Sequence, residues 1–141
     1  MNRAVGIARE WIGTPYVHQA SYKGVAADCL GLIRGIWREL YGDEPEAAPP
    51  YTPDWGEFGS RELLMDGALR HQLPVNRADE IASAQILLFR MRAGAVAKHL
   101  GIVSDGGEAP RFIHAYTHHG VIDSPLSTPW RNRIAARFRF P

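Results

Sequence analysis

The stretch Asp28-Cys29-Leu30-Gly31-Leu32-Ile33-Arg34-Gly35-Ile36-Trp37 predicts a helix that begins at the only cysteine of the chain. Asp28 is a residue type that commonly caps a helix N-terminus, so Cys29 falls in the first helical turn. The unpaired N–H groups and the dipole of a helix start favour a thiolate over a thiol. A lone cysteine has no internal disulfide partner, which leaves packing, metal binding or nucleophilic chemistry as its uses.

Hydrophobic periodicity extends this helix and predicts two more in the first half. Apolar residues with helical spacing continue the Cys29 helix to about Tyr41, and Gly42 ends it; they are Leu30, Ile33, Trp37 and Leu40. Residues 2–11 form an amphipathic helix with Val5, Ala8, Trp11 and Ile12 roughly on one face, and residues 60–72 form another. Residues 14–27 form a loop, and the proline-rich residues 43–58 form an extended surface excursion.

The second half of the chain changes to short strand-like runs separated by turns. These runs are Ile86–Met91, Leu100–Val103, Phe112–Tyr116, Gly120–Asp123 and Ile134–Phe140, the last with clear alternation from Arg137. Helices followed by an antiparallel meander predict one α+β domain over residues 1–141. The basic residues Arg131, Arg133, Arg137 and Arg139 favour a solvated strand face over a substrate contact.

Composition restricts the class of protein. The 141 residues are 45% hydrophobic and 22% charged, which is typical of a soluble globular domain with a real core. A formal net charge of +1 gives no reason to expect nucleic-acid binding. No apolar run approaches the ~20 residues of a membrane span, so no membrane insertion is expected. The charged N-terminus lacks a secretory signal, which predicts synthesis in the cytoplasm.

Two histidines can meet Cys29 in such a fold. His99 and His114 lie in consecutive strand-like runs, and neighbouring antiparallel strands can place them side by side on one sheet face. If the helix start docks on that face, one imidazole could deprotonate the thiol and the other could orient the first. Taken singly, each of these residues is more often a packed core residue than a catalyst. His18, His71, His118 and His119 are interpreted as structural or solvated.

Five segments of the chain resemble, in order and spacing, the NlpC-type cell-wall peptidases, which are papain-like cysteine endopeptidases. The segments are Trp11–Tyr16, Asp28–Leu32, Ile86–Phe89, Lys98–Ile102 and Phe112–Ala115, and the resemblance spans roughly residues 5–141. It implies a papain-like fold, with N-terminal helices packed on an antiparallel sheet and the nucleophile at a helix N-terminus. The proline-rich excursion and the ending Pro129–Pro141 further resemble a branch associated with phage tails and gene transfer agents.

The resemblance implies a role for each matching residue. Cys29 is the expected nucleophile, His99 the general base and His114 the residue that orients His99. Tyr16 is expected to help hold the oxyanion, and Asp28 matches a substrate-cleft position, although capping accounts for it equally well. Two departures from the family pattern are Leu30, where many relatives have Ser, and Ala84-Gln85, where many have Gly-Asp.

The resemblance also implies an activity, a partner and a location. The expected reaction is hydrolysis of peptidoglycan stem peptides, usually between D-glutamate and the next diamino acid, through a thioester and without a cofactor or metal. A phage-like tail could carry the enzyme to the periplasm or cell wall, with tail proteins as partners. Three alternatives stay open at this point: a catalytic zinc held by Cys29, His99 and His114, a catalytically silent tail component, and amidase or acyltransferase chemistry with the same three residues.

Overall fold

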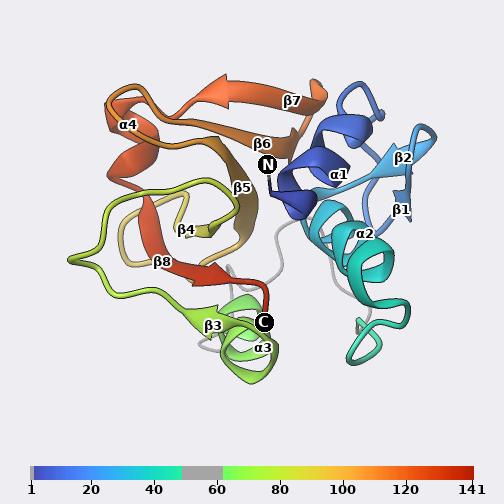
Figure 1. Ribbon diagram of the computed structural model, residues 1–141, viewed down its shortest axis with the longest axis horizontal. Helices are drawn as coiled ribbons and strands as arrows, with labels where there is room; N and C mark the ends of the chain where they lie inside the picture. Colours follow the sequence, from blue (N-terminus) through green and yellow to red (C-terminus); the bar gives the residue numbers. More distant parts are fainter. Residues whose placement is uncertain (1, 49–61) are drawn as a thin grey trace.

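The protein folds as helices packed against one strongly curved antiparallel sheet (Figure 1). The structure is a computed structural model that describes residues 2–48 and 62–141. Its helices are α1 (Arg3–Trp11), α2 (Cys29–Tyr41), α3 (Leu63–His71) and α4 (Thr128–Arg131). The main sheet has the strand order β3-β8-β4-β5-β6-β7. These strands are β3 (Leu73–Pro74), β4 (Ile86–Phe89), β5 (His99–Asp105), β6 (Arg111–Tyr116), β7 (Gly120–Pro125) and β8 (Ile134–Arg139). The predicted α+β class is confirmed.

Local capping fixes the bounds of α2 where the sequence placed them. The Asp28 carboxylate accepts a hydrogen bond from the Gly31 N–H at 2.7 Å, which satisfies one of the free donors of the helix start. At the other end, Gly42 has φ of 94°, a left-handed conformation that glycine adopts at little cost, and its N–H donates to the Arg38 carbonyl. Both ends of α2 are therefore encoded in neighbouring residues.

The deeply buried face of α2 differs from the predicted one. Leu32, Ile33 and Ile36 point into the main core, whereas Leu30 and Trp37 are only half-buried and face the side of α3. The helical spacing predicted for α2 is present at Leu30, Ile33, Trp37 and Leu40. However, α2 packs against apolar residues on two sides, the main core and the side of α3. Periodicity identified the helix and could not tell which of these neighbours lies deeper.

A close approach joins α1 to α2. The Trp11 ring lies against the backbone of Gly35, where any added Cβ would overlap it. The indole N–H donates to a Glu39 carboxylate oxygen at 2.8 Å, so this buried polar group is paired. Val5 and Ala8 are buried on the same side of α1 as predicted, but Ile12 lies beyond the helix and is exposed. The α1–α2 pair thereby forms one rigid layer over the sheet.

The sheet carries apolar residues on both faces. One core cluster joins α1, α2 and α3 to strands β4 to β8, and a second, smaller cluster includes Phe89, Phe112 and Leu126 on the other face. Along β5, Leu100 and Ile102 belong to the first cluster, so His99 points to the second face by strand alternation. The short α4 lies on this second side, where Trp130 packs on the smaller cluster.

Arg137 is buried, which corrects the predicted solvated face of the last strand. Its guanidinium donates to the Gln85 side chain and to four main-chain carbonyls of residues 76, 77, 79 and 80. The alternation of β8 correctly separated two faces. The loop between β3 and β4 covers the Arg137 side chain, and the five hydrogen bonds of this side chain hold the loop on the sheet.

Several short elements escaped prediction. The loop 14–27 contains a small hairpin of β1 (Ser21–Tyr22) and β2 (Ala26–Ala27), and both β3 and α4 were unpredicted. Residues 43–48 of the proline-rich excursion are neither helix nor strand, and residues 49–58 lie outside the described part of the chain. None of the helices within residues 2–48 and 62–141 is long and apolar enough to cross a membrane.

Candidate active site

Cys29 occupies the first position of α2, next to the beginning of β5. Its Sγ lies 3.6 Å from the Lys98 carbonyl oxygen, immediately before His99. The N–H groups of Leu100, Leu30 and Cys29 lower the pKa of this sulfur, opposing its burial. The sulfur therefore lies against the main chain on both sides of His99. This juxtaposition brings the nucleophile candidate of the helical layer to the start of β5.

His99 and His114 form a directly bonded pair. His99 Nε2 lies 2.8 Å from His114 Nδ1, with the two rings edge to face. Gly101 makes this approach possible, because a Cβ there would come within 3.3 Å of His114 Cβ and closer still to the Phe112 ring. Since Nε2 of His99 is engaged, Nδ1 is the ring nitrogen left to exchange a proton with a thiol.

A cavity of about 230 Å³ brings the predicted site residues together. Cys29, His99, Tyr16 and Asp28 all line it, and His114 lies directly behind His99. The other lining residues are His18, Met91, Lys98, Ala115, Tyr116 and Thr117. The cavity has room for a peptide group beside the sulfur and the imidazole.

The protonation of the site differs from the expectation at the helix start. Burial, followed by the nearby Asp28 carboxylate, raises the pKa of the Cys29 thiol to about 12, and this outweighs the N–H groups that favour the thiolate. Burial also lowers the pKa of His99 to about 3, with smaller contributions from His114 and Lys98. These directions favour a neutral thiol beside a neutral imidazole, opposite to the thiolate expected from the helix start.

Tyr16 reaches the cavity from the segment between α1 and β1. An isolated parallel bridge pairs Tyr16 with Ala27, two residues before Cys29. Burial and the neighbouring sulfur raise the pKa of the phenol, while a hydrogen bond with Thr117 opposes this. The hydroxyl thus stays protonated at neutral pH and can donate a hydrogen bond into the cavity.

Asp28 organises the backbone at the entrance to α2. Besides capping Gly31, its carboxylate accepts a hydrogen bond from the Gln19 N–H at 2.7 Å, and His18 Nδ1 lies 3.9 Å away. Asp28 is 2% exposed, which favours the capping account; its predicted substrate contact stays a prediction. His18, predicted to be a structural or solvated loop residue, also lines the cavity.

Two residues beside the histidine pair were missed by sequence reasoning. Ser124 of β7 places its Oγ 3.0 Å from His114 Nε2. Trp130 of α4 packs edge-on against His114, with ring centroids 5.2 Å apart, and also lies 5.5 Å from His99. Neither residue has a sequence signal, because β7 register and α4 docking bring them to the pair. Both imidazoles are buried where these two residues contact them.

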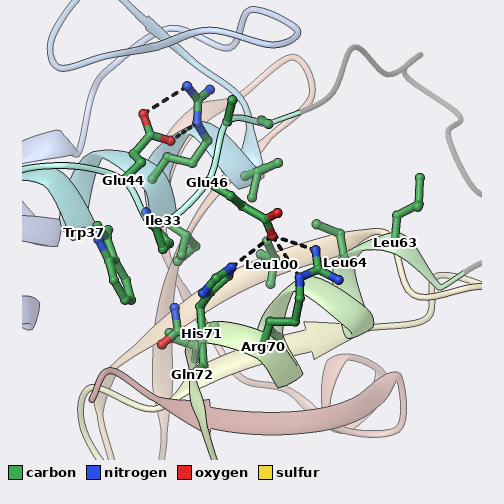
Figure 2. A pocket seen from close by; sticks show the side chains of 18 residues that line it. Ile33, Trp37, Glu44, Glu46, Leu63, Leu64, Arg70, His71, Gln72 and Leu100 are labelled. Carbon is green, nitrogen blue, oxygen red and sulfur yellow. Dashed lines mark hydrogen bonds and ion pairs between the residues drawn. The ribbon is translucent and has the colours of Figure 1, made fainter.

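A second, more apolar pocket of about 170 Å³ lies between α2, α3 and the sheet (Figure 2). Ion pairs line the edge of this pocket, where Glu46 accepts hydrogen bonds from Arg70 and contacts His71 of α3. The Gln72 side-chain oxygen is buried and has no hydrogen-bond partner among the described residues. Leu30 and Leu100 line this pocket, each directly after a site residue, so they form a wall near Cys29 and His99.

The geometry bears on the zinc alternative. The facing nitrogens of His99 and His114 are hydrogen-bonded to each other, so they are not turned toward a common ion. Within residues 2–48 and 62–141, no group of three or more His, Cys, Asp or Glu side chains is arranged to hold a metal. The two imidazoles that could have bound zinc are therefore bonded to each other.

Comparison with solved structures identifies the fold. An NlpC/P60 family protein from Bacillus cereus superposes with a TM-score of 0.65 at 17% identity, over 97% of this chain and 39% of its own. A lipoprotein-like NLP/P60 protein from Staphylococcus aureus gives 0.61 at 19%, over 97% and 40%. The NlpC/p60 domain of the peptidoglycan hydrolase SagA gives 0.55 at 22%, over 98% and 95%. The fold is the papain-like fold of these proteins.

Curated sequences give a second comparison. The chain is 29% identical over 126 residues to the Escherichia coli murein DD-endopeptidase MepS/murein LD-carboxypeptidase, covering 88% of this chain and 54% of the relative. It is 25% identical over 122 residues to a probable endopeptidase of Haemophilus influenzae, covering 86% and 62%. The chain thus spans little more than half the length of these relatives. No family model matches the chain.

Proposed function

We propose that this protein is a cysteine peptidase that hydrolyses stem peptides of peptidoglycan. The observation that carries the proposal is the 2.8 Å bond between His99 and His114 at the cavity that also holds Cys29. Thiol, base and orienting group are the parts that nucleophilic catalysis by cysteine requires. The names of the E. coli relative and of SagA, a murein endopeptidase and a peptidoglycan hydrolase, supply the substrate class.

The first half of the reaction forms a thioester. Cys29 Sγ attacks the carbonyl carbon of the scissile bond while its proton passes to Nδ1 of neutral His99. Because the pKa of the thiol is high and that of His99 is low in the free protein, this transfer accompanies the attack instead of preceding it. The Tyr16 hydroxyl and the N–H groups at the start of α2 donate to the oxyanion. The intermediate collapses when the amine leaves with the proton from His99.

The second half of the reaction regenerates the thiol. A water molecule gives one proton to His99 and attacks the thioester carbonyl, and the new carboxylic acid leaves as the C–S bond breaks. His99 then returns its proton to sulfur. Throughout, His114 accepts a hydrogen bond from His99 Nε2–H, which keeps Nδ1 as the reactive nitrogen. No metal or organic cofactor takes part in these steps.

The bond proposed for cleavage joins γ-D-glutamate to the following diamino acid. The name of the E. coli relative covers a DD and an LD bond, so the test must resolve which bond is cut. Purified peptidoglycan is digested with wild-type protein and with Cys29→Ala, and the fragments are identified by mass spectrometry. We expect new stem-peptide ends only with wild type. Identical fragment patterns would refute the peptidase and favour a silent structural protein of the same fold.

Substitutions of the histidines test the assigned roles. His99→Ala should abolish cleavage, whereas His114→Ala should lose less, because misorientation of a base is a partial defect. His71→Ala is the matched control: His71 lies on α3, is bonded to Glu46, and lines the second pocket, not the cavity that holds Cys29. Initial rates on one soluble peptide are compared for all three variants. An equal loss of rate in His71→Ala and His99→Ala would contradict the assignment of His99 as the base.

Delivery by a phage-like tail is a separate proposal. It is supported only by the resemblance of the proline-rich stretch and of residues 129–141 to the tail-associated branch. If it is correct, particles purified from a producing culture contain this chain in fixed ratio to tail proteins, measured by quantitative mass spectrometry. Finding the chain in the culture and none in the particles would end this part of the proposal.

A further inference from the structure

Ser124 extends the histidine pair by one more hydrogen-bonding group. His114 Nδ1 lies 2.8 Å from His99 Nε2, and its other nitrogen, Nε2, lies 3.0 Å from Ser124 Oγ. The strand pairing explains the contact: β6 and β7 are antiparallel, and Ser124 lies opposite Phe112, two residues before His114. Ser124 and His114 are therefore diagonal neighbours on the same face of the sheet.

The direction of the hydrogen bonds follows from the chemistry of the base. To take a proton at Nδ1, neutral His99 must carry its own hydrogen on Nε2 and donate it to His114 Nδ1. His114 then carries its hydrogen on Nε2, where Ser124 Oγ is the acceptor. In the opposite tautomer, His114 would donate from Nδ1 to His99, and His99 would present Nδ1–H to the thiol and be unable to accept its proton.

We propose that Ser124 is a positioning residue, whose hydroxyl oxygen accepts the His114 Nε2–H and so stabilises the tautomer in which His99 is a competent base. The inference rests on the proposed peptidase function. It concerns the location of one hydrogen, because packing alone already fixes the ring of His114. Phe112 stacks on that ring with centroids 4.1 Å apart, Tyr116 stacks on it at 5.4 Å, and Trp130 lies edge-on to it at 5.2 Å.

Loss of the hydroxyl should therefore change the tautomer and leave the ring in place. In Ser124→Ala the Nε2–H loses its acceptor in a largely buried site, which destabilises the active tautomer. We expect kcat to fall about tenfold, the value of one ordinary hydrogen bond, with KM unchanged because Ser124 lies behind His114 and away from the cavity. Ser124→Thr keeps the hydroxyl and should restore most of kcat.

Ser104 offers a matched control. Its hydroxyl lies on β5 and donates to Asp123, the residue next to Ser124, at 3.0 Å. Ser104→Ala therefore removes a similar hydroxyl from the same region without touching either histidine. We expect wild-type kcat for Ser104→Ala, even if its thermal stability falls. An equal loss of kcat in both alanine variants would reduce Ser124 to a structural residue and overturn the proposal.

Imidazole nitrogen NMR tests the proposal directly and requires no activity. Nitrogen shifts distinguish protonated from unprotonated ring nitrogens, so wild-type protein should show His114 protonated on Nε2, and Ser124→Ala should show a mixture. A wild-type His114 protonated on Nδ1, or an unchanged tautomer in Ser124→Ala, would overturn the proposal. Failure of the peptidase function appears separately, as wild-type and Cys29→Ala digests that do not differ.

Discussion

Acidification to about pH 5 should destabilise the folded protein through its two bonded histidines. Burial, with His114 and Lys98, lowers the pKa of His99 to about 3; burial, with His119, lowers that of His114 to about 4. In the unfolded chain both rings titrate near the ordinary value of about 6.5. Below that pH the two histidines bind protons in the unfolded state and stay unprotonated in the folded state. The stability is therefore complete above about pH 6.5 and is lost as the pH falls toward the folded-state pKa values.

The size of the loss follows from those values. At about pH 5, each ring is charged in the unfolded chain and neutral in the folded one. The pH then lies about 1.5 units below the unfolded-state pKa, and each unit costs about 1.4 kcal/mol per histidine. Each histidine thus removes about 2 kcal/mol from the free energy of unfolding, and the pair about 4 kcal/mol. This is a large part of the ~5–15 kcal/mol that stabilises an ordinary domain.

Carboxylates contribute little to the same interval. The pKa of Glu44 is lowered by Arg34 and Arg38 despite its partial burial, so its ion pairs are also lost on acidification. That loss is centred at and below the ordinary glutamate pKa of about 4.3, mostly under the range of the experiment. The decrease between about pH 7.5 and about pH 5 therefore reports mainly on the histidines.

Urea unfolding at a series of pH values measures the effect. Wild-type protein should lose about 4 kcal/mol across this range, and His114→Gln should lose about 2 kcal/mol less than wild type does. His118→Asn, at an exposed turn position, is the control and should follow the wild-type curve. A wild-type free energy that stays flat to pH 5, or a His114→Gln curve parallel to wild type, would refute the reasoning.

Two further predictions concern packing. Gly6→Ala adds a methyl group in open space on α1 and should raise the free energy of unfolding by about 0.5–1 kcal/mol. In Gly35→Ala the added methyl group meets the Trp11 ring, so the free energy of unfolding should fall by about 1–3 kcal/mol. Urea unfolding measures both variants, and a change of the same sign in both would contradict the contact between Trp11 and Gly35. Arg137→Leu should cost about 2–4 kcal/mol and expose the loop between β3 and β4 to trypsin, because the buried carbonyls lose their donor. Arg139→Leu, two residues further along β8 and exposed, should change neither by much, and matching behaviour of the two variants would contradict the role given to Arg137.

Elements with local signals could be predicted from the sequence. α2 was placed correctly at both ends because Asp28 caps it and Gly42 terminates it, and both signals lie within one turn of the helix. The main strands were found because their apolar runs are bounded by turns. The hairpin β1–β2 and strand β3 contain two residues each, too few for any periodicity. Their existence depends on the partner strand.

The candidate site was predictable in its members and not in its electrostatics. The resemblance named Cys29, His99 and His114, and the structure brings them to one place. The thiol pKa was predicted in the wrong direction, because helix position can be read from sequence whereas burial depends on the assembled layers. Ser124 and Arg137 were missed for a related reason: the sequence does not specify which strand or loop covers a polar side chain.

The division of the site between helix and sheet has a consequence for synthesis on the ribosome. The sulfur and its acceptor at Lys98 are 69 positions apart in the chain, and the second imidazole follows later still. During synthesis Cys29 therefore leaves the ribosome well before His99 and His114 do. Under the proposed function, hydrolysis should begin only after β6 has left the exit tunnel and α2 has packed against the sheet.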